Sequence, residues 1–322
     1  MKYFIVGGLG FIGSNLARKL LKESSNCVTI YDNYTSGHEW HLGDCLGASN
    51  LKIVRGDVKD LEALTSAMGG HDLVYHFASN PDISKAMTDP TIDFWEGTYL
   101  TQNVVEAMRR SQVPRLLYAS GSGVYGDVGE VPVFEALSPL HPTSTYGASK
   151  LAGEALICSY CHMFGITARC FRFANVVGEN QTHGVTYDFV RRLSANPNVL
   201  PILGNGSQSK SYIHSLDVIR AMRLFESPTG AIFDSFNVAT EDYISVTEIA
   251  QMCVKLLKLT NVEFNYSGGD RGWKGDVPIV RFDTSKIRSL GWSNALTSQQ
   301  AIEKSIQSVI SNISEGKIVY LA

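Results

Sequence analysis

The sequence predicts an α/β fold, in which a doubly wound parallel sheet is followed by a smaller α/β domain. Short, continuous apolar segments alternate with amphipathic segments through the first half of the 322 residues, a pattern typical of a parallel sheet covered on both faces. A glycine-rich turn joins the first apolar segment to the first amphipathic one. The predicted strands are 2–8, 27–32, 51–57, 72–78, 115–120 and 167–178, and the predicted helices are 11–23, 61–68, 91–111 and 145–165.

The alternation becomes irregular beyond about Val177, which predicts a second domain. Amphipathic segments near 187–195, 246–259 and 298–310 indicate helices there. We therefore expect a dinucleotide-binding domain over 1–176 and a mainly substrate-binding domain over 177–322. Part of 205–240 is expected to pack back on the first domain.

Composition excludes several kinds of partner. The formal net charge of −3 offers no basic field for nucleic acid or an anionic membrane, and no apolar run reaches the roughly 18 residues of a membrane span. The six cysteines lack framework spacing, so we expect a reduced compartment. The first strand follows the initial methionine at once, so we expect no signal peptide and a cytoplasmic protein.

The turn IVGGLGFIG carries the strongest binding motif. It places Gly7, Gly10 and Gly13 between the first strand and the first helix. Glycines let the backbone approach a pyrophosphate at a helix N-terminus, where unpaired N–H groups favour anions. Asp32 ends the second strand, where a carboxylate accepts hydrogen bonds from a ribose and repels a 2′-phosphate. The sequence therefore predicts NAD as the cofactor, in preference to NADP.

Other strand ends are expected to lie along the same dinucleotide, because ligands of open α/β sheets bind outside the carboxyl ends of the strands. Asp57-Val58 follows the third strand and could contact adenine, and small residues after His76 leave room for the cofactor. His76 itself is interpreted as a core histidine. The full set of expected NAD contacts is Gly7, Gly10, Phe11, Ile12, Gly13, Asp32, Asn33, Ser36, Gly37, Asp57, Val58, Phe77, Ala78, Ser79, Tyr146 and Lys150.

A proton-transfer set is predicted after the fifth strand. Tyr146 and Lys150 are four residues apart in YGASK, a spacing that places both on one face of a helix. A neighbouring ammonium favours the phenolate of a tyrosine. The fifth strand ends in ASGSG, so Ser122, or alternatively Ser120, can bind the same substrate oxygen. Tyr, Lys and Ser beside a nicotinamide suit the interconversion of an alcohol and a carbonyl.

Together these motifs resemble the extended short-chain dehydrogenase/reductases, which share a Rossmann-type fold, and within them the UDP-glucose 4-epimerase group. The resemblance spans essentially the whole chain. It is carried by the glycine turn at 7–13, DN at 32–33, GDV at 56–58, HFAS at 76–79, YGASK at 146–150, RFANVVG at 172–178 and KSYIHSLDV at 210–218.

The resemblance implies a 4-epimerase of UDP-glucose and UDP-galactose, and possible action on UDP-N-acetylhexosamines. Tyr146 would take the proton of the sugar 4-hydroxyl while a hydride passes from C4 to NAD, and the rotated 4-keto sugar would take the hydride back. Ser122 would bind the C4 oxygen, and Lys150 would contact the nicotinamide ribose. The resemblance also implies a homodimer formed through helices near 91–112 and 146–164.

The resemblance further implies substrate contacts at Asn175, Val185, Leu203, Lys210, Arg271, Asp276 and Val280. In the stretch GGDRGWKGDVPIVRFD, Trp273 stands where related enzymes have the diphosphate arginine. Arg271 or Lys274 must then supply that charge. Val280 occupies the position that gates the sugar, and its small side chain is expected to admit a 2-acetamido group.

Several alternatives stay open. A UDP-glucuronate 4-epimerase or decarboxylase, or another reductase or dehydratase of nucleotide sugars, could use the same three residues. Dehydration is disfavoured because Gly123 and Val124 replace the acid pair of the 4,6-dehydratases. A non-catalytic NAD-binding regulator is disfavoured by the intact Ser122, Tyr146 and Lys150.

Two further patterns are interpreted as structural, so no metal is expected. Cys158-x-x-Cys161-His162 matches a haem attachment pattern but lies on the Tyr146 helix, where packing explains it. His38 and His41 lie near Asp44 and Cys45, but no additional ligand pair supports a metal site.

Overall fold

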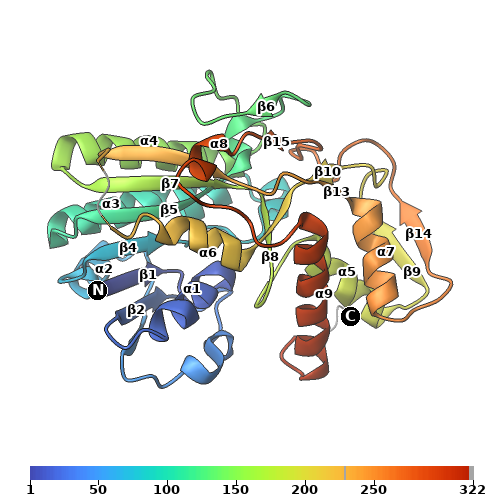
Figure 1. Ribbon diagram of the computed structural model, residues 1–322, viewed down its shortest axis with the longest axis horizontal. Helices are drawn as coiled ribbons and strands as arrows, with labels where there is room; N and C mark the ends of the chain where they lie inside the picture. Colours follow the sequence, from blue (N-terminus) through green and yellow to red (C-terminus); the bar gives the residue numbers. More distant parts are fainter. Residues whose placement is uncertain (228–229, 319–322) are drawn as a thin grey trace. The chain divides into compact units, whose positions relative to one another are not determined.

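The computed structural model describes residues 1–227 and 230–318, which form two compact units (Figure 1). The first unit comprises Met1–Val124, Ser144–Phe173 and Ile219–Phe236. The second comprises Tyr125–Thr143, Ala174–Val218 and the residues from Asn237 onward. The loop 125–143, which we expected in the first domain, lies in the second unit because its strand β6 (Pro132–Val133) pairs there with β15 (Arg281–Phe282).

A seven-stranded sheet forms the centre of the first unit and confirms the predicted fold class. Its order is β12-β7-β5-β4-β1-β2-β3. The pairs from β7 to β3 are parallel, and the order reverses between β1 and β4, as in doubly wound sheets. The strands are β1 (Lys2–Val6), β2 (Cys27–Asp32), β3 (Leu51–Arg55), β4 (Leu73–His76), β5 (Arg115–Gly121), β7 (Thr167–Phe173) and β12 (Phe233–Val238).

Helices cover both faces of this sheet, which explains why its central strands are mainly apolar. In Figure 1, α3 and α4 lie on one side of the strands and α1 on the other. Val104, Met108, Leu116 and Ile157 are fully buried in the core cluster between the sheet and the α3–α4 side. The helices of this unit are α1 (Phe11–Leu21), α2 (Leu61–Met68), α3 (Tyr99–Ser111) and α4 (Thr145–Phe164), and α6 (Ser215–Arg223) spans the boundary of the two units.

Two local features set the position of α4. Ser144 caps its N-terminus by accepting a hydrogen bond from the Gly147 N–H at 3.1 Å. The predicted helix 91–111 begins instead with a π-helical turn, η3 (Phe94–Thr98), and becomes α-helical only at Tyr99. This turn packs against α4, because a Cβ on Gly97 would lie 2.1 Å from the Ser149 hydroxyl oxygen. A larger residue at this contact would require the Ser149 side chain to move.

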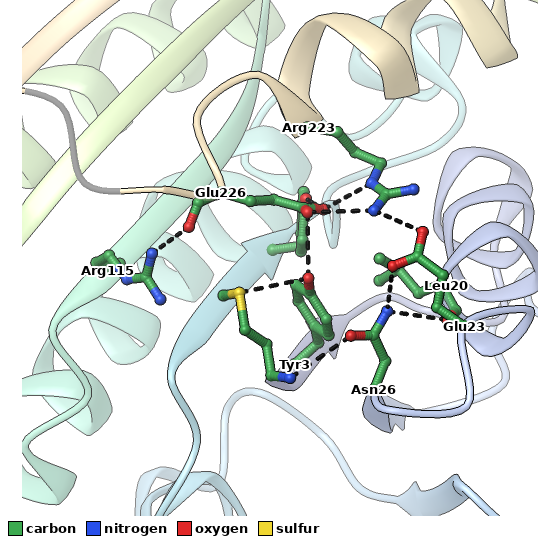
Figure 2. Close-up of polar contacts among 9 residues, drawn as sticks. Tyr3, Leu20, Glu23, Asn26, Arg115, Arg223 and Glu226 are labelled. Carbon is green, nitrogen blue, oxygen red and sulfur yellow. Dashed lines mark hydrogen bonds and ion pairs between the residues drawn. The ribbon is translucent and has the colours of Figure 1, made fainter.

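The amino ends of the central strands are tied to the segment after α6 by Glu226 (Figure 2). The Glu226 carboxylate accepts hydrogen bonds from the Tyr3 hydroxyl at 3.1 Å and the Tyr75 hydroxyl at 2.7 Å. It also pairs with Arg223 at 2.9 Å, and Arg223 in turn pairs with Glu23. This network lies at the sheet edge opposite to the carboxyl ends of the strands, so it is structural.

Among the described residues, the second unit contains the helices α5, α7, α8 and α9 and four two-stranded sheets. Its core packs Val190, Ile249, Cys253, Ile302 and Ile306 from α5, α7 and α9. Ser245 and Thr297 start α7 and α9 with capping boxes, as their Ser-x-x-Glu and Thr-x-x-Gln spacing predicts. The four two-stranded sheets pair β8 with β11, β9 with β14, β10 with β13 and β6 with β15. The elements not yet bounded are β8 (Asn175–Val177), α5 (Val185–Ala195), β9 (Val199–Ile202), β10 (Ser209–Lys210), β11 (Tyr212–His214), β13 (Ile244–Ser245), α7 (Val246–Leu256), β14 (Glu263–Tyr266), α8 (Ser285–Arg288) and α9 (Ser298–Ser314).

Within the described ranges, none of the helices has the length and apolar character that crossing a membrane requires.

Candidate active site

The glycine turn forms a close-packed cradle between β1 and α1. Gly7 lies at φ +76°, and a Cβ there would be 2.8 Å from the Ala78 nitrogen. A Cβ on Gly13 would be 2.4 Å from the Gly7 carbonyl oxygen. Gly10 is the N-cap of α1, so the first helical N–H groups, which start at Phe11 and Ile12, have no acceptor within the helix. The cradle therefore fits a pyrophosphate, which accepts such N–H groups.

Asp32 joins the end of β2 to this cradle. Its carboxylate accepts the Leu9 N–H at 2.9 Å and the Tyr34 N–H at 2.8 Å. Burial raises the pKa of Asp32, and these two backbone bonds oppose that rise. A carboxylate has about four lone-pair sites, so both oxygens can still accept ribose hydroxyls. Gly37 packs directly on Asp32, because a Cβ there would lie 2.8 Å from Oδ1.

The other expected cofactor contacts lie at the same edge of the sheet, after β2, β3 and β4. The Asn33 amide donates to the Asp57 carboxylate at 3.3 Å, and Val58 is buried. Phe77, Ala78 and Ser79 follow β4 and are half-buried. Ser36 is also half-buried, in the loop after β2. The fold thus brings the predicted NAD contacts to one edge of the first unit.

Replacing Gly13 with alanine is expected to weaken NAD binding about tenfold or more. The new methyl group would meet the backbone of Gly7 and Gly8, so the turn must open and its N–H groups must move. Calorimetric titration with NAD measures the loss. Gly69→Ala is the matched control, because a Cβ there comes no nearer than 4.0 Å to another atom. Unchanged NAD affinity in the Gly13→Ala protein would contradict the assignment of the cradle.

Tyr146 and Lys150 lie on the first turns of α4. The Lys150 side chain is only 3% exposed. Its ammonium donates to the Ala119 carbonyl of β5 at 2.9 Å and lies 5.5 Å from the centre of the Tyr146 ring. The Tyr146 hydroxyl is hydrogen-bonded to Ser79, beside the glycine cradle. The predicted proton-transfer pair therefore adjoins the expected cofactor contacts.

Burial shifts the pKa of both side chains of this pair. Desolvation raises the pKa of Tyr146 to about 12, against a lowering effect of the Ser79 hydrogen bond. Desolvation also lowers the pKa of Lys150 to about 8. The tyrosine therefore holds its proton firmly in this state, and a positive charge nearby is required before it can act as a base.

The two serines of β5 and the following turn have different surroundings. The Ser120 hydroxyl donates to the Glu154 carboxylate at 2.6 Å and is buried. Glu154 is also paired with Arg172 at 2.7 Å. Ser122 is half-buried in the turn after β5. Its hydroxyl makes no hydrogen bond to any of the residues that the structure describes. Ser122 is thus the serine that is left to bind a ligand.

His76 is completely buried, and its Nε2 lies 3.1 Å from the Thr101 hydroxyl oxygen. Burial lowers the pKa of His76 to about 3, with a smaller contribution from Lys150. The ring is therefore neutral at physiological pH, and it packs beside Tyr118.

In the second unit, four of the predicted substrate contacts cluster around one carboxylate. Asp276 pairs with Lys210 at 2.5 Å and accepts the Gly272 N–H at 3.0 Å. Arg271 donates to the Asp276 carbonyl at 2.7 Å and also pairs with Asp127. Leu203 lies beside Gly272, with 3.8 Å between its Cβ and a Cβ built on the glycine.

The three remaining substrate candidates are less directly connected to the residues around Asp276. Asn175 pairs in register with Tyr212, two residues beyond Lys210, and its side chain is hydrogen-bonded to the Tyr212 hydroxyl. Val280 is buried in the strand-like segment beside Ser209. Val185 starts α5 and packs against the core of the unit, and no contact joins it to the Asp276 cluster within the described residues.

Sequence reasoning missed three groups that hold this site. Glu154 and Arg172 form a buried ion pair behind β5, and Asp127 binds Arg271. Asp93 is buried beside the start of α4 and accepts a hydrogen bond from Thr145 at 2.6 Å. The spacing of Lys150 and Glu154, four residues apart on one helix face, was the one signal present in the sequence.

Comparison with known proteins identifies the family. The profile of the NAD dependent epimerase/dehydratase family matches residues 3–239. UDP-glucose 4-epimerase from Corynebacterium glutamicum is 30% identical over 79% of this chain and 79% of its own. dTDP-glucose 4,6-dehydratase from Streptomyces niveus is 27% identical over 70% of this chain and 68% of its own.

A solved UDP-galactose 4-epimerase structure covers 97% of this chain and 100% of its own, with a TM-score of 0.86 and 33% identity. The matches thus include epimerases and a dehydratase on the same fold. The family match covers the glycine cradle, Asp32 and the Tyr146–Lys150 pair. The chain therefore belongs to the NAD-dependent epimerase/dehydratase family, and its cofactor is NAD.

Proposed function

We propose that this protein is a 4-epimerase of nucleotide sugars, acting on UDP-glucose and UDP-galactose and also on UDP-N-acetylhexosamines. The observation that carries the proposal is the Tyr146–Lys150 pair beside a glycine cradle, with the hydroxyl of Ser122 still available. The relatives that are epimerases support the same reaction type.

The reacting groups of the chain have distinct roles in this proposal. Ser122 donates a hydrogen bond to the C4 oxygen of the sugar, and Tyr146 accepts the proton of the C4 hydroxyl as the alcohol becomes a ketone. Lys150 favours the phenolate through its positive charge. NAD held by the glycine cradle and Asp32 would supply a reversible hydride acceptor for C4. Tyr146 then returns its proton to the C4 oxygen, which restores an alcohol.

Inversion requires that the ketone present its other face before the alcohol is restored. Ser122 and the protonated Tyr146 are both hydrogen-bond donors to a ketone oxygen in either orientation of the ring. The turn after Ser122 contains Gly123 and Val124, with no acid before Asp127. An elimination of water needs such an acid or base near C5 and C6, so epimerisation is favoured over dehydration.

We propose that the Asp276 cluster binds the nucleotide end of the substrate. Lys210 and Arg271 supply cationic donors for a diphosphate, and Arg271 offers a planar fork that suits phosphate oxygens. Asp276 supplies a carboxylate for a ribose hydroxyl. Both cations are held by carboxylates of the second unit, so binding would exchange these carboxylates for phosphate.

The experiment that tests the function offers UDP-glucose, UDP-N-acetylglucosamine and UDP-glucuronate separately and follows C4 inversion by NMR. We expect the first two sugars to be inverted. Val280→Tyr is expected to lose UDP-N-acetylglucosamine inversion about tenfold or more, because a larger side chain removes the space for the acetamido group. Retained inversion of UDP-glucose by the same variant is the control for folding.

If UDP-glucuronate alone is inverted, the protein is a UDP-glucuronate 4-epimerase and the proposed substrates are wrong. If none of the three sugars is inverted, the proposed function is refuted. A UDP-N-acetylhexosamine that neither reacts nor competes would refute the role of Val280 only.

We further propose that a second copy of the chain is a partner. Phe94 and Trp95 are about half exposed on η3, and Met163 and Phe164 are 71% and 45% exposed at the end of α4. Exposed large apolar side chains of this kind are typical of interfaces. Sedimentation velocity is expected to give the mass of a dimer, and a monomer at micromolar concentration would contradict it.

A further inference from the structure

Asp93 joins two segments that border the proton-transfer pair. It immediately precedes η3 and is 1% exposed. One carboxylate oxygen accepts the Asn80 amide at 2.9 Å, and the other accepts the Thr145 hydroxyl at 2.6 Å. Asn80 follows Ser79, the partner of the Tyr146 hydroxyl, and Thr145 is the first residue of α4. The Asp93 side chain thus holds the residue that follows Ser79 and the residue that precedes Tyr146.

The π-helical turn that follows Asp93 makes the contact with α4 close. Gly97 approaches the Ser149 hydroxyl, and the Thr98 hydroxyl donates to that oxygen at 3.2 Å. Ser149 directly precedes Lys150. The segment 93–98 therefore contacts α4 at Thr145, directly before Tyr146, and at Ser149, directly before Lys150, and π-helical turns are frequent at functional sites.

Apart from Asp93, the titratable and charged groups around Lys150 lie on four elements. Glu154 lies one turn further along α4 but is paired with Arg172 of β7. His76 of β4 is neutral, as described above, and the Tyr118 ring of β5 lies 5.1 Å from the Lys150 ammonium. Both Asp93 and Glu154 raise the pKa of Lys150 against desolvation.

Asp93 differs from Glu154 in its partners. Its two hydrogen bonds come from an amide and a hydroxyl, which are neutral. Across the residues that the structure describes, Asp93 forms no ion pair within 4.0 Å. Its charge is therefore not matched by an adjacent guanidinium, as that of Glu154 is, and acts on the ammonium through a buried region of low dielectric.

We propose that Asp93 is a positioning residue of the Tyr146–Lys150 pair: it fixes the first turn of α4 and places a buried negative charge beside that turn. The catalytic meaning of this role rests on the proposed function, whereas the placement of Asp93 and its charge do not.

The test compares Asp93→Asn with the wild type, both as NAD-bound protein labelled with [¹³C]lysine. The amide of the variant can still accept from Asn80 and donate to Thr145, so the contacts are retained and only the charge is removed. NMR follows the Lys150 Cε resonance, assigned by its loss in Lys150→Arg, across pH 6 to 10. We expect the pKa of Lys150 to fall by about half a unit or more. Asp93→Ser, which also lacks the charge, replaces the variant if Asp93→Asn does not fold.

Thr145→Val is the matched control, because it removes a hydrogen bond to Asp93 and leaves the charge. Its Lys150 pKa is expected to equal that of the wild type. An unchanged Lys150 pKa in Asp93→Asn, or an equal fall in Thr145→Val, would overturn the proposal.

An activity profile gives the second readout. The alkaline limb of kcat for sugar inversion is expected to move to lower pH in Asp93→Asn by the same shift as the Lys150 pKa, and an unmoved limb would overturn the proposal. If the wild type inverts no sugar, the proposed function fails, and the NMR titration still decides the role of Asp93.

Discussion

Replacing Tyr146 with phenylalanine is expected to lower kcat for C4 inversion by about 10² to 10⁴. The variant removes one hydroxyl, the group that accepts the proton of the C4 alcohol, from a helix whose Ser144 cap does not involve it. Because the aromatic ring is retained, the packing beside Lys150 is expected to persist. Inversion of UDP-glucose followed by NMR measures the loss.

The control for this variant is NAD binding, which is expected to persist because the cradle at Gly7, Gly10 and Gly13 is untouched and only one of the expected cofactor contacts, the Tyr146 hydroxyl, is removed. Lys150→Met is expected to lose activity to a similar extent, since the phenolate then lacks its cation. A Tyr146→Phe protein with undiminished inversion would contradict the assigned base.

Replacing Arg172 with methionine is expected to lower the free energy of unfolding by about 3–5 kcal/mol, because the Glu154 carboxylate would then be buried without its guanidinium. The pair is 6% and 5% exposed and lies at 2.7 Å. Urea unfolding followed by circular dichroism measures the loss. The double variant Arg172→Met, Glu154→Leu is expected to recover part of it, although Ser120 loses its acceptor.

Arg110→Met is the matched control on the surface. Arg110 pairs with Glu62 at 2.7 Å, but the two side chains are 37% and 83% exposed. Water screens such a pair, so its removal is expected to cost much less than the loss of Arg172. Equal losses in the Arg172 and Arg110 variants would show that the buried pair is not a structural anchor.

Most of the first unit was predictable because its central strands are buried on both faces and therefore mainly apolar. The strand β12 was not predicted. Its polar residues Asp234, Ser235 and Asn237 interrupt the apolar run, and an edge strand tolerates them. The π-helical turn at the start of the 91–111 helix could not be predicted from the sequence either, because hydrophobic periodicity does not distinguish one π-helical turn from an α-helix.

The candidate site was predictable where a motif is local in sequence, as in the glycine turn and Tyr146-x-x-x-Lys150. The choice between Ser120 and Ser122 required the structure, since it depends on Glu154, which lies 34 residues beyond Ser120. Asp93 was missed for a similar reason. A single acid in an amphipathic segment is typical of a solvated surface, and only the fold buries it beside Thr145.

The most direct measurement of the central claim uses UDP-glucose carrying deuterium at C4, incubated with the NAD-bound protein in ordinary water. A hydride that is removed from C4 and returned to its opposite face keeps the label. The account therefore predicts UDP-galactose with deuterium retained at C4 and no net NADH. Deuterium lost to solvent, or found at C6 of a dehydrated product, would contradict it.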